Sequence, residues 1–220
     1  MMEEFIHALK NRLQQPLPGI RAQALMSPQL EQDARFKLQP RPDARQGSVL
    51  LLLYPQQNTI WLPLMQRPQY QGHHSGQVSL PGGKWEPGDT DRLQTALRET
   101  EEEMGIPRQG VQILGTLSEL YIPPSNFVVL PVVGYMPSAP AFVPDPAEVE
   151  QVLEVPLPDL LEENFIRFTN TPPGSLYKIR TPYYPVEERV VWGATAMILS
   201  EFVTLVNEME TRHHLLKRQS

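Results

Sequence analysis

The chain has 220 residues, contains no cysteine, and carries a formal charge of −6 at pH 7, with 19 lysines and arginines against 25 aspartates and glutamates. The lack of cysteine excludes disulfides, thiolate metal ligands and thiol catalysis, and the acidic balance disfavours nucleic acid as the main partner. No apolar run approaches the ~20 residues that span a bilayer, and the N-terminus lacks signal-peptide features, so we expect a cytoplasmic protein with no membrane partner.

The first 46 residues are predicted to form a helix followed by an irregular segment that wraps the rest of the chain. Apolar residues recur at helical spacing over residues 2–14, and the stretch up to residue 47 is rich in proline and glutamine, with room for one short helix. The first helix is amphipathic, so it can pack on its own chain or mediate a homodimer, and we favour the homodimer.

The next part of the chain is predicted to begin with two strands. Residues 48–55 and 59–67 are apolar runs separated by a short polar turn, which indicates a β-hairpin. A loop dense in glycine and proline follows. A helix is then predicted over residues 91–104, because Asp91 is a good residue for its first turn and Gly105 is typical of a helix end.

The rest of the chain is predicted to be mixed. We expect strands joined by a Pro-Pro-Ser turn, a short strand leading into a helical turn, further β structure, and a closing helix; these lie in residues 111–123, 126–136, 148–162, 177–194 and 194–216. Strands mixed with two main helices predict an α+β fold. We expect one domain over residues 47–210 and a tail over 211–220.

Three carboxylates of the predicted helix share one narrow face. At about 100° per residue, Glu102 and Glu103 fall near −60° and +40° from Glu99, whereas Glu101 falls on the far side and is expected to face water. Carboxylates this close repel one another unless a cation or full solvation reduces the repulsion. Hard divalent cations prefer oxygen ligands, so this face is either a metal site or a solvated acidic edge.

The loop ahead of the helix favours the metal site. Paired glycines, Gly82 and Gly83, allow the backbone to turn sharply or to approach a ligand closely. Arg98, next to Glu99 in sequence, can orient a carboxylate or pair with Asp89. We therefore count Arg98 as a catalytic candidate together with the three glutamates.

The segment GGKWEPGDTDRLQTALRETEEEMGI resembles the Nudix box, G-x5-E-x7-R-E-U-x-E-E-x-G-U, of the hydrolases of nucleoside diphosphates linked to another group. The matching residues are Gly83, Arg98, Glu99, Glu102, Glu103, Gly105 and Ile106. The resemblance implies a Nudix fold, in which a mixed β-sheet is sandwiched between α-helices. It also implies that Glu99, Glu102 and Glu103 are catalytic metal ligands for Mg²⁺ or Mn²⁺.

The box departs from the motif in two respects, one of which is Thr100 at a position that is usually aliphatic. Gly83 and Arg98 are separated by one residue more than the motif has, so its first acid is either Asp89 or is replaced by Thr90. Relatives often supply a further carboxylate from downstream. Glu148 and Glu150 are candidates for it, although acids on the surface of a loop are the commoner interpretation.

The segment LMQRPQYQGHHSGQVSLPGG, residues 64–83, resembles an additional signature of the coenzyme A diphosphatase branch of this family. Gly72 stands where that branch has a second arginine, and the neighbouring His74 could replace it as a donor. The resemblance implies hydrolysis of coenzyme A and its derivatives to 3′,5′-ADP and 4′-phosphopantetheine. The residues expected to contact this small-molecule substrate are Arg67, Gly82, Gly83, Lys84 and His74.

Two other interpretations remain open. The chain could be another Nudix enzyme, acting on ADP-ribose, a dinucleoside polyphosphate or an oxidised nucleotide. It could also be an inactive Nudix domain that senses a ligand or binds a protein. The three intact glutamates, Glu99, Glu102 and Glu103, favour an enzyme over the inactive domain.

Overall fold

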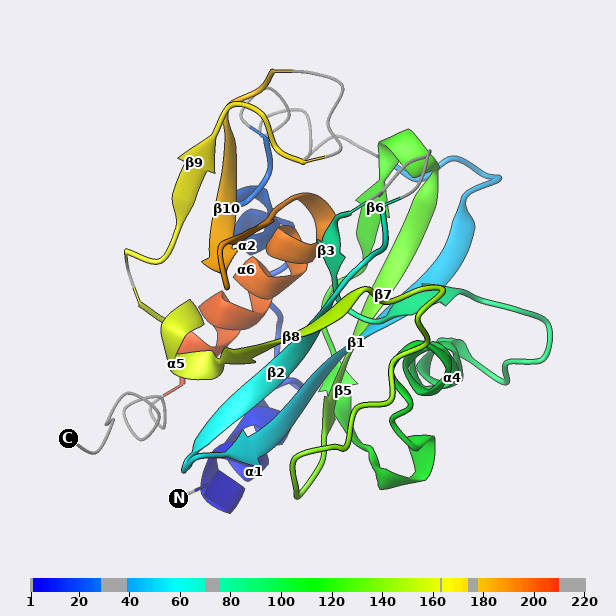
Figure 1. Cartoon of the computed structure of the whole chain (residues 1–220), viewed down its shortest axis with the longest axis vertical. Helices are drawn as coiled ribbons and strands as arrows, with labels where there is room; N and C mark the ends of the chain where they lie inside the picture. The colour runs from blue at the N-terminus through cyan, green and yellow to red at the C-terminus, as the bar shows by residue number, and fades with distance from the viewer. Residues whose placement is uncertain (1, 29–38, 70–75, 163, 174–177, 210–220) are drawn as a thin grey trace.

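The structure of the protein is a computed structural model (Figure 1). It describes residues 2–28, 39–69, 76–162, 164–173 and 178–209.

A mixed β-sheet forms the centre of the molecule. Five strands follow one another across it in the order β3 (Val78–Ser79), β2 (Thr59–Gln66), β1 (Arg45–Gln56), β7 (Phe127–Tyr135) and β5 (Gln112–Thr116). Three further strands pair with members of this row: β4 (Gly82–Lys84) with β1, β6 (Leu120–Ile122) with β7, and β8 (Gln151–Pro156) with β2. β1 and β7 run parallel and the other pairs are antiparallel, so the predicted α+β fold with a mixed sheet is confirmed.

Helices cover both faces of this sheet (Figure 1). One face packs against α1 (Met2–Arg12) and α6 (Gly193–Asn207), with α2 (Ile20–Ala24) against α6, and the other face packs against α4 (Arg92–Met104). The short helical turns α5 (Leu157–Leu160) and η3 (Pro123–Ser125) connect strands, and η2 (Arg108–Gly110) connects α4 to β5. The predicted sandwich is therefore present.

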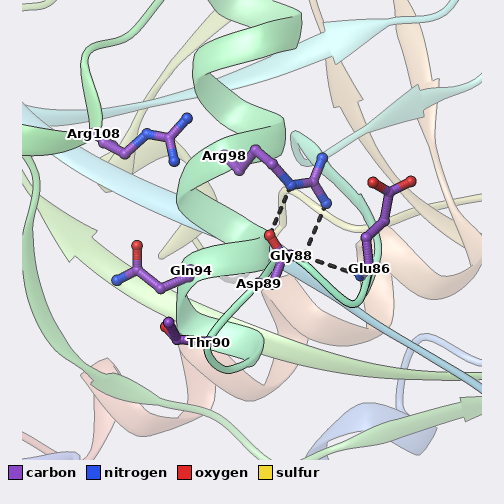
Figure 2. A pocket seen from close by; sticks show the side chains of 7 residues that line it. All are labelled: Glu86, Gly88, Asp89, Thr90, Gln94, Arg98 and Arg108. Atoms are coloured by element: carbon purple, nitrogen blue, oxygen red, sulfur yellow. Dashed lines mark hydrogen bonds and ion pairs between the residues drawn. The ribbon is translucent and has the colours of Figure 1, made fainter.

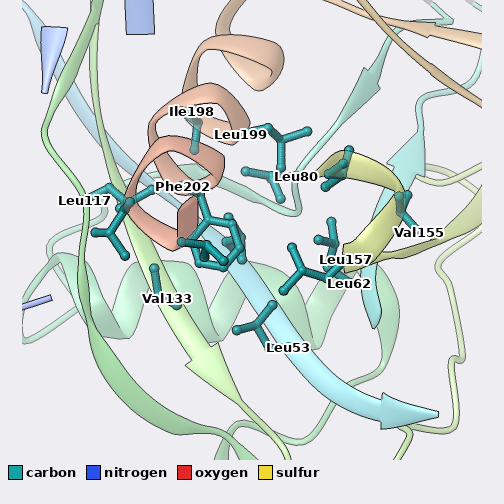
Figure 3. Packing of buried hydrophobic residues seen from close by; sticks show 14 of the residues in the cluster. Leu53, Leu62, Leu80, Leu117, Val133, Val155, Leu157, Ile198, Leu199 and Phe202 are labelled. Carbon is teal, nitrogen blue, oxygen red and sulfur yellow. The ribbon is translucent and has the colours of Figure 1, made fainter. Parts of the chain in front are cut away.

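The leucine run of β1 explains why the sheet is buried on both sides. Successive residues of a strand point to opposite faces. Leu51 and Leu53 lie in the cluster that contains Phe202 of α6, part of which Figure 3 shows, whereas Leu50 and Leu52 lie in the cluster beneath α4. An uninterrupted apolar strand is what a layer between two helical layers requires.

A second, smaller sheet lies next to α6. Its strands are β9 (Arg167–Thr169), β10 (Thr181–Val186) and β11 (Arg189–Val191), with β10 in the centre. β10 and β11 confirm the β structure expected there, whereas β9 was not predicted. Tyr184 and Val186 of β10 are buried in the main core, which attaches the small sheet to the domain.

Several predicted elements are confirmed with changed ends. The hairpin of β1 and β2 forms as expected, and α1 ends at Arg12. The closing helix was predicted to reach residue 216, but it ends at Asn207, where the amide of Met209 bonds to the Val206 carbonyl and tightens the last turn. Residues 210–216 lie outside the described residues.

The N-terminal segment contributes to the same core as the sheet. Phe5, Leu9 and Met26 are buried in the cluster that contains α6. The division into residues 1–46, 47–210 and 211–220 stays a prediction. In the part of the chain that the structure describes, no helix combines the length and apolar character needed to cross a membrane.

Candidate active site

Two glycines bring β4 close to both β1 and α4. Gly82 has φ 143°, and a Cβ atom there would lie 2.3 Å from the Ser48 carbonyl oxygen of β1. A Cβ atom on Gly83 would lie 2.6 Å from both carboxylate oxygens of Glu99. Any larger residue would force these groups apart. The glycine pair therefore lets the Glu99 carboxylate lie directly against β4.

The caps of α4 set the register of its glutamates. Asp91 is the N-cap and accepts a hydrogen bond from the amide of Gln94 at 2.9 Å. Gly105 ends the helix in the left-handed region at φ 68°, and its amide donates to the Glu101 carbonyl. Both predicted ends are confirmed. Between them, Glu99 and Glu103 lie one turn apart, which places their side chains on the same side of the helix.

Glu103 is the most deeply buried carboxylate of the box, with 2% of its side chain exposed. The amide of Gly82 donates to its Oε2 at 2.7 Å, and Nη2 of Arg67 lies 3.3 Å from its Oε1. Burial raises the pKa of Glu103 to about 7, against the opposing effects of Arg67 and the Gly82 amide. The Gly82 amide and Arg67 therefore replace only part of the solvation that the Glu103 carboxylate loses on burial.

Glu99 is also desolvated, while Glu102 lies at the edge of the site. Burial raises the pKa of Glu99, and its neighbour Arg98, with Nη2 at 3.1 Å from Oε1, opposes that rise. Glu102 is 56% exposed and its Oε2 accepts from Nη1 of Arg98 at 3.0 Å. Of the three predicted metal ligands, two are held in a low-polarity environment and the third faces solvent.

Asp89 anchors the guanidinium of Arg98 through an ion pair (Figure 2). Nε and Nη2 of Arg98 donate to the two Asp89 oxygens at 2.8 and 3.0 Å, and Thr95 Oγ1 donates to Oδ2 at 2.9 Å. The Arg98 guanidinium holds the pKa of Asp89 well below its usual range. Asp89, rather than Thr90, thus occupies the first acidic position of the box, and it fixes an arginine that positions Glu99 and Glu102.

A hollow of about 220 Å³ lies over this anchor (Figure 2). Its walls come from the loop before α4, from α4 itself and from the chain after it: Glu86, Gly88, Asp89, Thr90, Gln94, Arg98 and Arg108. None of the three predicted metal ligands lines it. We therefore infer that the hollow borders the Asp89–Arg98 pair and is not where the reaction takes place.

A fourth carboxylate, Glu148, approaches the site from a distant loop. In space, this loop runs beside the C-terminal end of α4, because the amides of Val143 and Asp145 donate to the carbonyls of Met104 and Glu103, both at 2.9 Å. The charge of Glu148 contributes to the raised pKa of Glu99 and of Glu103. Of the two downstream acids considered, Glu148 is the one that acts on these glutamates.

Glu101 does not simply face water, as the helical projection had predicted. It accepts hydrogen bonds from the amide and Nε of Arg108, and those bonds lower its pKa. The cause is the left-handed Gly105, after which the chain turns back and carries Arg108 to the outer side of α4. Glu101 thus supports the end of the helix.

Of the predicted substrate contacts, Arg67 and Gly82 lie at Glu103 and Lys84 lies at the end of β4. Arg67 lies against Glu103, and Lys84 is exposed at the end of β4, with its carbonyl accepting from Arg98 Nη2 at 3.1 Å. The amide of Gly82 is bonded to Glu103. His74 and Gly72 lie outside the described residues, and the roles assigned to all these residues stay predictions.

The donor set fits a hard divalent cation, although the described residues contain no group of three histidine or acidic side chains already arranged as a metal site. Oxygen atoms are the ligands that Mg²⁺ and Mn²⁺ prefer. Arg67 and Arg98 contact the carboxylates in this structure. A bound cation would offset the burial and, to a smaller extent, the charge repulsion that raise the pKa of Glu103 and Glu99.

Comparison with known proteins agrees with this geometry. The family model described as the NUDIX domain matches residues 44–171. The chain is 34% identical over 179 residues to the "Uncharacterized Nudix hydrolase NudL" of Photorhabdus laumondii subsp. laumondii, covering 78% of this chain and 94% of that protein. It is 33% identical over 181 residues to the protein of that name from Yersinia enterocolitica, covering 79% and 91%.

A solved structure shares the fold. The crystal structure of a MutT/nudix family protein from Enterococcus faecalis superposes with a TM-score of 0.52 at 15% identity, covering 90% of this chain and 77% of that one. On this fold, α4 carries glutamates next to the glycines of β4, and the family match assigns the chain to the hydrolases that cleave the pyrophosphate bond of small nucleotide-type molecules. The chain belongs to the Nudix family, and the predicted membership is confirmed.

Proposed function

We propose that this Nudix hydrolase cleaves the pyrophosphate bond of coenzyme A and its acyl derivatives, releasing 3′,5′-ADP and 4′-phosphopantetheine or its acylated form. The substrate class is supported by the resemblance of residues 64–83 to the coenzyme A diphosphatase signature. The chemistry is supported by one observation above all. The charges of Glu99 and Glu148 act on Glu103, and that of Glu148 acts on Glu99 as well, beside β4, where Arg67 contacts Glu103.

Glu99 and Glu103 are the proposed holders of Mg²⁺ or Mn²⁺, with Glu102 at the exposed edge. When bound, the cation supplies positive charge that neutralises the diphosphate and makes water a better nucleophile. The residues around it keep the carboxylates in place: the Gly82 amide holds Glu103, and Arg98 holds Glu99.

Arg67 is the proposed contact for a phosphate oxygen. Its distance of 3.3 Å from Glu103 is long for a charge-assisted hydrogen bond, which leaves donors of the guanidinium available. A planar guanidinium matches two phosphate oxygens well. Lys84, exposed at the end of β4 one residue after Gly83, offers a second cation.

Glu148 is the proposed general base. It is exposed to solvent and close enough to Glu99 and Glu103 to affect their protonation. An attacking water forms a new O–P bond and passes a proton to the Glu148 carboxylate, while the bond from phosphorus to the bridging oxygen breaks. The bridging oxygen leaves with the second phosphate.

A substrate panel tests this proposal. Coenzyme A, acetyl-coenzyme A, ADP-ribose, a dinucleoside tetraphosphate and an oxidised nucleotide are incubated with Mg²⁺ or Mn²⁺, and the products are identified by mass. Glu103→Gln is run beside the wild type. Glu101→Gln is the matched control, because Glu101 lies on the same helix but pairs with Arg108 outside the site.

The expected result is release of 3′,5′-ADP and 4′-phosphopantetheine, abolished by Glu103→Gln and retained by Glu101→Gln. A clear preference for ADP-ribose would overturn the substrate and keep the family. That alternative is favoured by Gly72, which replaces the second arginine of the coenzyme A branch. A folded protein that binds metal but turns over nothing would instead be a ligand-sensing module.

A further inference from the structure

An aromatic–arginine pair is exposed on the hairpin of β9 and β10. The guanidinium carbon of Arg180 lies 4.1 Å from the ring centroid of Phe168. Phe168 is 50% exposed and Arg180 is exposed as well. The family match ends at residue 171, so Arg180 belongs to a part of the chain that the general family pattern does not describe.

The pair lies on the inner side of the small sheet. Phe168 is the cross-strand partner of Pro182, and residues two apart on β10 share a face, so Phe168 lies on the face of Tyr184 and Val186. Those two residues are buried in the main core. Phe168 therefore continues the inner face beyond the edge of the core, where its ring is exposed and Arg180 stacks on it.

Two hydrogen bonds connect this hairpin to the catalytic edge of the main sheet. The carbonyl of Pro173, four residues after β9 ends, accepts from Nε2 of Gln77 at 3.3 Å. The carbonyl of Gln77 accepts from the amide of Arg67 at 2.9 Å. Figure 1 shows the chain after β9 running toward the end of the main sheet that carries β3. The hairpin is thus joined to Arg67, the residue that follows β2.

Arg180 has the chemistry of a phosphate ligand. None of the ion pairs formed within the described part of this acidic chain includes it. A guanidinium stacked on an aromatic ring keeps its edge N–H groups directed outward, where they can bind two oxygens of one phosphate. Lys178, also exposed, adds positive charge two residues earlier.

We propose that Arg180, held in place by Phe168, binds a phosphate monoester on the nucleoside half of the substrate, away from the diphosphate that is cleaved. The inference rests on the proposed function, because coenzyme A carries a phosphate of this kind and releases it in 3′,5′-ADP. The diphosphate would then bind at Arg67 and the nucleoside would extend toward the hairpin. Arg180 is accordingly a residue that determines substrate specificity.

Direct binding separates this inference from catalysis. The full chain is titrated calorimetrically with 3′,5′-ADP and with 5′-AMP, which lacks the second phosphate, for wild type, Arg180→Gln and Arg167→Gln. Arg167 is a matched control, because it is an exposed arginine of the same hairpin whose partner Tyr183 places it on the opposite face. Arg180→Lys tests whether charge alone suffices.

We expect the wild type to bind 3′,5′-ADP about ten-fold more tightly than 5′-AMP, which is the size of one charge-assisted bidentate contact. Arg180→Gln should remove this preference, Arg180→Lys should keep part of it, and Arg167→Gln should leave it unchanged. Equal binding by the wild type, a preference that survives in Arg180→Gln, or an equal loss in Arg167→Gln would overturn the inference.

The outcome is independent of the substrate panel. A preference for 3′,5′-ADP that depends on Arg180, in a protein that does not cleave coenzyme A, would support this binding site and contradict the proposed function. Cleavage of coenzyme A without any preference for the second phosphate would contradict this binding site alone.

Discussion

Two glutamates are buried on opposite sides of the central sheet, and their surroundings differ. Glu201 of α6 is fully buried and accepts three hydrogen bonds from neutral donors: the amides of Gly19 and Ser118 and the side chain of Gln23, at 3.0, 3.2 and 2.8 Å. Glu103 of α4 is almost as buried, but it has one amide, from Gly82, and the more distant Arg67.

The difference separates a carboxylate that stabilises the fold from one prepared for a ligand. A buried charge is tolerated when hydrogen bonds replace its water. Glu201 has donors from two segments, so it ties the N-terminal segment and the loop after β5 to α6. Glu103 keeps acceptor capacity that its protein donors do not use, and a cation can use it. The following predictions test whether the two glutamates differ in this way.

The largest expected effect is on activity. Replacing Glu103 by glutamine removes a proposed metal ligand, and we expect kcat/KM to fall by about 10³-fold, or about 4 kcal/mol in the transition state. The free energy of unfolding of the metal-free protein should not fall at pH 8, because the poorly compensated charge is gone. Steady-state kinetics and urea denaturation measure the two quantities. A stable Glu103→Gln protein with normal activity would contradict the proposed role of Glu103 in the reaction.

The opposite pattern is expected on the other side of the sheet. Glu201→Gln places an amide NH₂ group against donors that need an acceptor, and we expect the free energy of unfolding to fall by about 3 kcal/mol. The value of kcat/KM per folded molecule should stay within about two-fold of the wild type. Urea denaturation with activity measured below the transition is the test. Lost activity in a fully stable Glu201→Gln protein would contradict the structural role.

The pH dependence of stability should come from Glu103. Burial raises its pKa from an ordinary 4.5 to about 7 in the folded protein, so the folded state binds the proton more tightly. This stabilisation is complete below pH 4.5 and is lost as the pH rises through 7, by about 3 kcal/mol at pH 8. Wild type and Glu103→Gln are compared by urea denaturation with a chelator from pH 5 to 8. Parallel curves for the two proteins would refute the assignment.

A smaller loss of activity is expected when a glycine of β4 is replaced. A Cβ atom on Gly83 would meet the Glu99 carboxylate, so Gly83→Ala should displace that ligand and lower kcat/KM about ten-fold. Gly88→Ala is the control, since a Cβ atom there meets nothing within 4 Å. Equal activities of the two variants would show that the position of Glu99 does not matter.

Local patterns in the sequence predicted the parts of the fold and the site that depend on neighbours along the chain. The caps at Asp91 and Gly105, the hairpin of β1 and β2 and the common side of Glu99 and Glu103 all follow from short-range rules. The pairing of Glu101 with Arg108 was missed because a helical projection stops where the helix ends. The turn at Gly105 then decides which side chains meet.

Long-range contacts were beyond the same reasoning. Glu148 reaches the site only because the amides of Val143 and Asp145 bond to carbonyls at the end of α4, more than thirty residues earlier. Glu201 is the one acid of α6, and its donors come from residues far away in sequence. β9 is too short to show a period and depends on its pairing with β10.

Manganese binding tests the central claim most directly. Mn²⁺ is titrated at pH 8 into wild type, Glu103→Gln and Glu101→Gln, and the free ion is followed by electron paramagnetic resonance. We predict that Glu103→Gln weakens Mn²⁺ binding about ten-fold or more while Glu101→Gln binds like the wild type. Equal affinity of all three proteins for Mn²⁺ would contradict the assignment of Glu103 as a metal ligand.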